Sequence, residues 1–460
     1  MSTPETEHLD GAVLYGASPD LVKSVAAALD EDNFTALGQL LNSLHAADVA
    51  DVLKNVGSDH RTKLVEWLRP HLDPEILHHL EESVREEVLE QIGTEDLAAA
   101  LSDLDSDDAL AVIEYLDDDL QREVLRAIPI EDRAILEEVL TYPEDSAGRL
   151  MQREVALVPS FWNVGEVTHH LATSQDMPDS FYDVYVVNPK HQPIGWVPLC
   201  RLLRQESSTS ICNVMEEELY KIPVTMDREE VGRLFQHYGL VSAPVVDASG
   251  RLVGMITVDD VVTVMQEEAT EDILHLAGTQ ESDFHAPAAA TFMMRFRWLF
   301  VTLINSIIAV TVISQFQDTI EKLVALAVLM NIATAMGGNA GMQVVTVAVR
   351  ALATRDLREG NIFRTLRKEL SVGFMNGCLF ALLLGVVSAL FYKNMGISMV
   401  LAGALIFNMV WAAFSGILLP VAISRIGMDP ALSAGPLLTA TTDVLGYAVF
   451  LGLASWFLIA

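Results

Sequence analysis

Long apolar stretches are confined to the last third of the chain. Up to about residue 290, apolar and polar positions alternate at short helical or strand spacing. Beyond it, five apolar stretches occur, at residues 297–316, 323–349, 371–392, 398–424 and 431–460. A helix needs about 20 such residues to cross ~30 Å of hydrocarbon. We therefore expect an α-helical transmembrane domain of five helices over residues 291–460, surrounded by membrane lipid.

Residues 1–140 are predicted to form an acidic, all-α N-terminal domain. Between residues 20 and 140 the apolar positions follow helical periodicity in short pieces, which are broken at Gly57 and Gly93. Leu97, Leu101 and Leu104 show the spacing of one such piece. Helices of about three to four turns, stacked as a small superhelix, match this pattern.

Residues 150–206 and 212–268 read as one unit repeated. Two blocks align between the copies: residues 158–167 with 222–231, and residues 186–197 with 245–256. Each copy reads strand, helix, strand, turn, strand, helix, which predicts a pair of α/β domains. The predicted boundaries are 141–207 for the first domain, 208–263 for the second, and 264–290 for an acidic connecting helix and linker.

The formal charge of −34 is concentrated in the soluble part. Residues 1–290 carry 18 Lys and Arg against 56 Asp and Glu, a net of −38, whereas residues 291–460 carry 11 against 7, a net of +4. This balance argues against nucleic acid as a partner, because phosphate binding needs Lys and Arg patches. The acidic charge favours metal cations or basic proteins as partners. The alternative is that these carboxylates only form a surface solvated by water.

Basic residues between the spans predict the orientation of the chain. With the start of the first span inside, the inner connections hold nine Lys and Arg residues, and the outer ones hold two, Lys322 and Lys393. The positive-inside rule then places the N-terminus in the cytoplasm and the C-terminus outside. No basic n-region followed by an apolar h-region opens the sequence, so a cleavable secretory signal is not expected. We predict a multi-pass protein of the cell (inner) membrane.

Asp443 is the only formally charged side chain between residues 431 and 460. A carboxylate at that depth costs several kcal/mol unless it faces water, a cation or a partner. Thr439, Thr441 and Thr442 surround it with hydroxyls that can accept hydrogen bonds from water held on an ion. We predict that Asp443 meets a cation; the alternative is a carboxylate paired across helices.

The second span contains the run Ala-Met-Gly-Gly-Asn-Ala-Gly-Met-Gln at residues 335–343. Its three glycines and two amides are expected to interrupt the helix at membrane depth. Loosened backbone there has to be buried in protein or line a wet cavity. The alternative is that Gly337, Gly338 and Gly341 allow close helix packing.

Acidic side chains are spaced for metal binding on the predicted connecting helix. Glu267 and Glu271 are four residues apart, as are Glu268 and Asp272. Each like-charged pair destabilises a helix by a few tenths of a kcal/mol, and a divalent cation would reverse that effect. Asp103 and Asp107 have the same spacing and suggest a second metal site. In both places a solvated acidic face is the competing interpretation.

The sequence supports no enzyme. It contains no His-Glu-x-x-His, no Gly-x-Ser-x-Gly and no phosphate-binding Gly-Lys-Ser/Thr. The adjacent pair His78 and His79 is expected to lie at the surface, since neighbouring residues on a helix point to different faces.

The repeated unit resembles a pair of CBS domains, regulatory modules that often bind adenine nucleotides between their halves. The resemblance is clearest at residues 254–260, Gly-Met-Ile-Thr-Val-Asp-Asp, which look like the family's phosphate-and-ribose segment. The first copy has Gly-Trp-Val-Pro-Leu-Cys-Arg at residues 195–201 and lacks the Thr and Asp. The resemblance thus implies at most one ordinary ATP site.

Nearly the whole chain resembles the MgtE family of magnesium channels. The most specific matches are Gly-Gly-Asn-Ala-Gly-Met-Gln at 337–343, Asp-Pro-Ala at 429–431 with Asp443, and Ala-Thr-Glu-Asp at 269–272. The resemblance implies a homodimer with a pore along the dimer axis, in which Asp443 of each subunit holds a hydrated Mg²⁺. Such a site suits Mg²⁺, which dehydrates reluctantly and keeps several waters.

The resemblance further implies that cytoplasmic Mg²⁺ closes the pore. If the family's regulatory ligands are transferred to the matching positions of this sequence, they are Glu229, Asp260, Glu268, Glu271, Asp272 and Asp429. Two departures stand out: Asn331 replaces a proline common in the family, and Thr263 stands where some members have an acidic residue.

Two other functions remain open on sequence grounds. One is a proton- or sodium-coupled transporter of divalent cations on the same scaffold. The other is a CBS-regulated membrane scaffold without ion flux.

Overall fold

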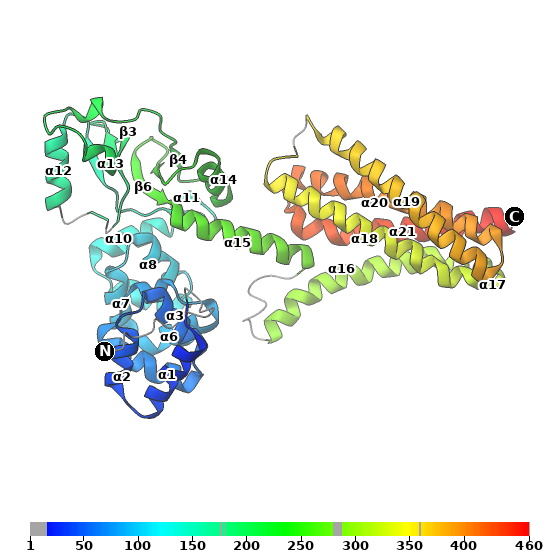
Figure 1. The fold of residues 1–460 in the computed structure, drawn as a ribbon, viewed down its shortest axis with the longest axis horizontal. Coiled ribbons are helices and arrows are strands. Elements are labelled where there is room, and N and C mark those ends of the chain that lie inside the picture. Colours follow the sequence, from blue (N-terminus) through cyan, green and yellow to red (C-terminus); the bar gives the residue numbers. More distant parts are fainter. Residues whose placement is uncertain (1–15, 175–176, 179, 279–287, 358–359, 460) are drawn as a thin grey trace, which may run out of the picture. The chain divides into compact units, whose positions relative to one another are not determined.

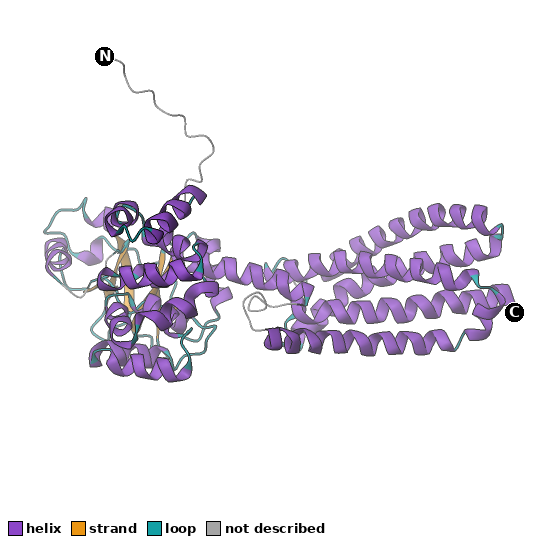
Figure 2. Ribbon diagram, turned by 90° about the horizontal axis from the view of Figure 1, so that it is seen from below, coloured by secondary structure: helices purple, strands orange, loops and turns teal. Residues whose placement is uncertain are grey.

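The computed structural model describes residues 16–174, 177–178, 180–278, 288–357 and 360–459. They form two compact units, Met1–Gln266 and Glu267–Ala460. Strands occur only in the first unit, within the described residues, and the second is helical throughout (Figure 2). The prediction of an all-α domain, an α/β pair and five membrane helices is confirmed.

The N-terminal part of the first unit is a stack of short helices (Figure 1). They are α1 (Pro19–Asp30), α2 (Phe34–Leu41), α3 (Ala46–Asn55), α4 (Ser58–Leu68), α5 (Glu75–His78), α6 (Glu82–Ile92), α7 (Thr94–Ser102), α8 (Ser106–Ile113), α9 (Asp118–Ala127) and α10 (Ile130–Val139). A 3₁₀ turn, η1 (Arg69–His71), follows α4.

Local sequence sets where several of these helices begin and end. The side chains of Ser18 and Asn33 accept backbone N–H bonds at the starts of α1 and α2, which satisfies donors that have no partner inside the helix. Gly93, with φ +87°, separates α6 from α7, and a residue with a Cβ is strained in that conformation. Helices two apart in the chain, such as α4 and α6 or α7 and α9, pack on one another.

Two three-stranded sheets follow, and they repeat one topology. The first contains β1 (Leu157–Pro159), β2 (Asp183–Val187) and β3 (Pro193–Pro198); the second contains β4 (Ile222–Pro223), β5 (Ser242–Val246) and β6 (Leu252–Thr257). In each sheet the first strand is parallel to the second, and the third is antiparallel to it. The helices between and after the strands are α11 (Ala147–Leu150), α12 (Val164–Thr173), α13 (Leu199–Leu202), η2 (Ile211–Asn213) and α14 (Arg228–Tyr238).

The repeat extends to equivalent glycines. Gly195 and Gly254 occupy the same place in the two copies, and a backbone carbonyl approaches each of them, from Glu216 and Gln152 respectively. A Cβ on either glycine would lie 2.7 Å or less from that carbonyl oxygen, so a larger residue would force the chains apart. In each copy, this glycine therefore packs against the segment that precedes the first strand of the other copy.

The second copy shares a continuous apolar core with the helical stack. Buried residues such as Val231, Phe235 and Ile256 join Ile113 and Leu136 in one cluster, whereas the first copy has a separate core around Val184 and Val197. This packing brings the start of α15 (Val258–Ala277) near α8 within the first unit.

The second unit contains the membrane helices. After the later part of α15 come α16 (Ala288–Ser314), α17 (Gln317–Lys322), α18 (Ala325–Ala353), α19 (Ile362–Tyr392), α20 (Met395–Arg425), α21 (Pro430–Ala454) and a π-helical turn (Ser455–Ile459). Five helices are long and apolar enough to cross a membrane, namely α16, α18, α19, α20 and α21. Helix α20 is the most buried of the five and packs on α18, α19 and α21.

The predicted interruption of the second span is wrong. Helix α18 runs unbroken through Gly337, Gly338 and Gly341. Two of these glycines instead allow close packing: a Cβ on Gly337 would overlap the Asn408 amide, and one on Gly341 would lie 2.9 Å from Leu438. The contacts that α18 makes with α20 and α21 keep the glycine-rich segment helical, so the packing alternative holds at these two positions.

Candidate metal sites

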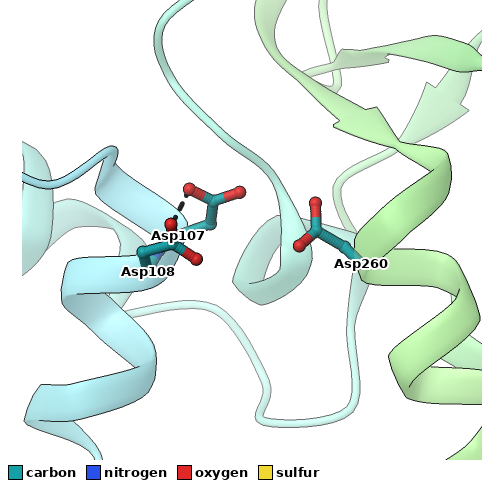
Figure 3. A group of neighbouring side chains, drawn as sticks. All are labelled: Asp107, Asp108 and Asp260. Carbon is teal, nitrogen blue, oxygen red and sulfur yellow. Dashed lines mark hydrogen bonds between the residues drawn. The ribbon is translucent and has the colours of Figure 1, made fainter. Parts of the chain in front are cut away.

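Three carboxylates converge in the first unit. Asp107, Asp108 and Asp260 each place one oxygen within 4.8 Å of the others (Figure 3). Asp107 and Asp108 lie in the first turn of α8, and Asp260 lies in the first turn of α15. The positive end of each helix dipole partly stabilises the negative charges, worth roughly 0.3–1 kcal/mol each.

The electrostatics of this acidic cluster favour a cation. Burial raises the pKa of Asp107 well above its usual range, and the charge of Asp260 adds to the shift. Burial also raises the pKa of Asp260 to about 6, although Thr257 Oγ1 donates a hydrogen bond of 2.7 Å to its Oδ2. A divalent cation would offset both the burial of these charges and their mutual repulsion, and carboxylate oxygens are the ligands that Mg²⁺ prefers.

His78 adds a titratable group beside this cluster. Its Nδ1 lies 3.0 Å from Oδ1 of Asp108, and that contact raises the pKa of His78 despite partial burial. The His78 side chain is one-third exposed and paired with Asp108, whereas His79 is exposed. The apolar residues Ile76 and Leu77 fix α5 against the stack, and this turns His78 toward α8.

The structure separates two residues that the sequence placed together. Helix α7 ends at Ser102 and α8 begins at Ser106, so Asp103 and Asp107 do not share one helix face as expected. Asp103 is exposed at the C-terminal end of α7. Asp108 joins Asp107 in the cluster instead of Asp103. The four-residue spacing did not point to Asp108, and in the sequence only its position next to Asp107 indicated it.

Glu229 lies in the first turn of α14, where its Oε1 accepts a 2.9 Å hydrogen bond from Nη1 of Arg233. It is not one of the three clustered carboxylates. Of the two ligands carried over from the family in this region, Asp260 lies in a group with Asp107 and Asp108, and Glu229 forms an ion pair along its own helix.

A second group of acidic residues lies in the second unit. Asp429 caps α21, with Oδ1 accepting the Ala431 N–H at 2.8 Å and Oδ2 lying 3.0 Å from Nδ1 of His275. The other ring nitrogen of His275 lies 3.5 Å from Oε1 of Glu271. Burial raises the pKa of Asp272, and the nearby charge of Asp429 contributes to that shift.

These residues connect the end of α15 with the start of α21. Sequence reasoning selected Glu271, Asp272 and Asp429, and it missed His275 between them. The spacing of Glu271 and His275, one helical turn apart, could have indicated the pair. Glu268 lies one turn before Asp272 on the same helix and is partly exposed.

Asp443 lies midway along α21 and is partly buried. No hydrogen bond or ion pair joins its carboxylate to another residue in the part of the chain that the structure describes. The hydroxyls of Thr439, Thr441 and Thr442 donate to carbonyls of their own helix, so their oxygens can still accept. Thr442, however, is fully buried against neighbouring helices.

A hydrogen-bonded frame holds α21 near Asp443. The Tyr447 hydroxyl, one turn after Asp443, donates a 3.1 Å hydrogen bond to Oδ1 of Asn331 on α18. The Asn408 amide donates to the Ala333 carbonyl at 2.9 Å and fills the space beside Gly446. Asn331, which stands where a proline is common in the family, thus accepts an interhelical hydrogen bond that a proline side chain could not accept.

Comparison with known proteins covers most of the chain. Family models match residues 330–453 as the divalent cation transporter family MgtE, residues 44–145 as the MgtE intracellular N domain, and residues 211–267 as a CBS domain. The magnesium transporter MgtE of Thermus thermophilus is 31% identical over 450 residues, covering 94% of this chain and 98% of the relative. That of Bacillus subtilis is 27% identical over 440 residues, covering 95% and 98%.

Two solved structures resemble the soluble part. The cytosolic domain of the Mg²⁺ channel MgtE in complex with ATP is 29% identical, with a TM-score of 0.50, covering 53% of this chain and 99% of that one. The soluble part of a magnesium transporter, 23% identical with a TM-score of 0.50, covers 54% and 98% and supports the fold alone. The helical domain, the paired sheets, the five membrane helices and these matches together show that the chain belongs to the MgtE family of divalent cation transporters.

Proposed function

We propose that this protein is a magnesium-selective channel that admits Mg²⁺ across the cell membrane and closes when cytoplasmic Mg²⁺ is high. The observation that carries the proposal is Asp443, a carboxylate in a membrane helix with no protein partner among the described residues. The relatives named magnesium transporters supply the choice of ion.

The proposed permeation site needs two subunits. One carboxylate and a few acceptor oxygens are too few ligands for a dehydrated Mg²⁺, which demands six. Two Asp443 side chains facing each other across a homodimer axis would hold a hydrated ion through its waters, and the ion would cancel their repulsion. The exposed face of α16, which includes Phe292, Phe296 and Phe300, is left for lipid or the second subunit.

Regulation is proposed to act through the acidic groups. Without a cation, the cluster of Asp107, Asp108 and Asp260 opposes the packing of α8 against α15. A Mg²⁺ ion bound only in the compact form stabilises that form by RT ln(1 + [L]/Kd), about 2.7 kcal/mol at 100 times Kd. We propose the same role for the group around Glu271, Asp272 and Asp429 in the second unit, with Glu268 as a further ligand. Within the first unit, we propose Glu229 as a separate regulatory ligand.

Magnesium flux into proteoliposomes tests this function. The purified protein should pass Mg²⁺ down its gradient, and Asp443→Ala should reduce flux to that of empty liposomes. The matched control is Asp318→Ala, which removes an exposed carboxylate from α17. Flux should fall as Mg²⁺ on the cytoplasmic face rises.

Other outcomes separate the competing functions. Flux only under an imposed proton or sodium gradient would favour the coupled transporter. No flux under any of these gradients would favour the CBS-regulated scaffold.

We also propose ATP as a ligand of the CBS pair, and the support is a relative's cytosolic domain that was solved in complex with ATP. In this chain the Thr257 hydroxyl donates a hydrogen bond to the Asp260 carboxylate, and Asp260 also belongs to the acidic cluster.

A further inference from the structure

Helix α19 packs on α20 with one face and exposes the other along its whole length. A Cβ on Gly373 would lie 2.8 Å from the Met409 carbonyl oxygen of α20. One on Gly377 would lie 3.0 Å from Cα of Ile406, also on α20. Because the two backbones approach this closely, the rotation of α19 is fixed, and α20 decides which of its side chains point outward.

The outward face of α19 is apolar over most of the helix. Its exposed side chains recur at spacings of three or four residues, which is one face of a helix: Val372, Met375, Leu379, Leu382, Val386 and Leu390. Helix α20 packs on both α19 and α21, so this face points away from the helix that carries Asp443. In a membrane, an exposed apolar face of this length meets lipid acyl chains.

The same face becomes basic where α19 begins. Lys368 and Arg364 precede Met375 by seven and eleven residues, which is about two and three helical turns. Arg367 lies beside Lys368, and all three basic side chains are exposed. The Phe363 ring next to Arg364 is 81% exposed. We call Arg364, Arg367 and Lys368 the basic end of α19.

The basic end of α19 lies at the level of lipid headgroups. The apolar stretch predicted from the sequence begins at residue 371. At about 1.5 Å per residue, Cα of Lys368 lies about 5 Å before that point and Cα of Arg364 about 10 Å before it. The headgroup layer is about 5–7 Å thick on each side of the hydrocarbon, and long basic side chains can reach its phosphates.

These cations are left for a partner outside the protein. Arg364 and Arg367 form no ion pair with another side chain in the part of the chain that the structure describes. Nζ of Lys368 lies 3.3 Å from Oε1 of Glu369, yet the Lys368 side chain is 71% exposed, against 12% for Glu369. The Asp356 carboxylate, which precedes α19, is engaged by a hydroxyl of its own turn. Guanidinium groups bind phosphate through two parallel N–H bonds.

We propose that the basic end of α19 binds the headgroup of an anionic phospholipid, whose acyl chains lie along the apolar face of the same helix. The guanidinium groups and the ammonium would donate to the phosphate oxygens. Each Lys or Arg near an anionic surface strengthens binding about fivefold. Phosphatidylcholine also carries a phosphate, but its choline cation cancels that charge, so it should bind more weakly. The site includes none of the proposed Mg²⁺ ligands, so it stands whether or not the channel function holds.

Thermal unfolding of the full-length protein in mixed micelles of detergent and lipid tests the proposal. Phosphatidylglycerol should raise the melting temperature at a several-fold lower mole fraction than phosphatidylcholine. Arg364→Gln with Lys368→Gln should raise the phosphatidylglycerol fraction needed for half of the effect by at least about fivefold, and leave the response to phosphatidylcholine unchanged. An unchanged response of this variant to phosphatidylglycerol would overturn the proposal.

Two further variants separate lipid binding from a general effect of charge. Lys322→Gln with Lys393→Gln also removes two positive charges, from exposed positions at the end of α17 and after α19, and should respond like the unmodified protein. Arg364→Lys with Lys368→Arg keeps both charges and should retain most of the response. If the Lys322 and Lys393 variant loses the response as strongly, net charge explains the effect and the proposal fails.

Inorganic phosphate distinguishes a lipid headgroup from a soluble anion. At millimolar concentration in phosphatidylcholine micelles, phosphate should leave the melting temperature unchanged. A rise equal to that from phosphatidylglycerol, and lost in the Arg364 and Lys368 glutamine variant, would assign the basic end of α19 to a soluble anion and overturn lipid binding.

Discussion

Nδ1 of His275 lies 3.0 Å from Oδ2 of Asp429, 154 residues later in the chain. This contact joins the end of the connecting helix α15 to the residue that caps the membrane helix α21. The contact therefore ties the end of α15 to the same helix that carries Asp443.

Neutralising Glu271 and Asp272 together, to Gln and Asn, should leave the pore intact and prevent its closure. The variant loses two carboxylates next to Asp429 and so cannot hold a cation there. Mg²⁺ flux should persist at cytoplasmic Mg²⁺ concentrations that stop the unmodified protein. Asp118→Asn with Asp119→Asn, an equal charge change in the first turn of α9, should close normally. Loss of flux in the Glu271 and Asp272 variant would contradict the sensor assignment.

Asp108→Asn should abolish most of the stabilisation that Mg²⁺ confers on the first unit. Removing one of three ligands raises Kd, so the gain in unfolding free energy at saturating Mg²⁺ should fall by about 1–3 kcal/mol. Thermal unfolding of the full-length protein, with and without Mg²⁺, measures this difference. Asp103→Asn is the control, because Asp103 lies outside the cluster; equal effects of the two changes would show that the cluster is not the site.

Without Mg²⁺, the free energy of unfolding should fall as pH rises through about 6. The folded-state pKa of Asp260 is raised to about 6 from 3.8, so the folded protein holds its proton more tightly than the unfolded one does. This proton adds roughly 1–3 kcal/mol to the free energy of unfolding. The full contribution is present below about pH 3.8, and it is lost as pH rises through the folded-state pKa of about 6.

Mg²⁺ should reverse this trend, because the ion binds the deprotonated carboxylate. Asp260→Asn should flatten the dependence between pH 4 and 7 in the absence of the ion. Chemical denaturation across this pH range checks both expectations. A dependence that survives in Asp260→Asn would assign the titration to another group.

Gly337→Ala should destabilise the membrane domain, whereas Gly338→Ala should not. A methyl at Gly337 overlaps the buried Asn408 amide, and overpacking of this kind costs about 1–3 kcal/mol. At Gly338 the nearest atom is 3.9 Å away, so alanine should gain helix propensity of up to about 1 kcal/mol. Thermal unfolding in detergent compares the two, and similar melting temperatures would contradict the packing of α18 on α20.

The sequence alone determined the five spans, the helical stack and the repeated α/β unit. These follow from one-dimensional patterns: a span needs an uninterrupted apolar length, a strand or helix needs its own period, and a repeated fold repeats its apolar positions. Asp443 was also evident, because a single charge in an apolar segment has few structural uses.

Only the tertiary structure decided which side chains meet. Asp108 and Asp260 are 152 positions apart and meet because the second CBS copy shares its core with the helical stack. His275 reaches Asp429 because α15 and α21 lie together within the second unit. Helix α18 stays unbroken because Asn408 and Leu438 pack against its glycines, and contacts between segments distant in sequence override the local tendency of glycine to loosen a helix.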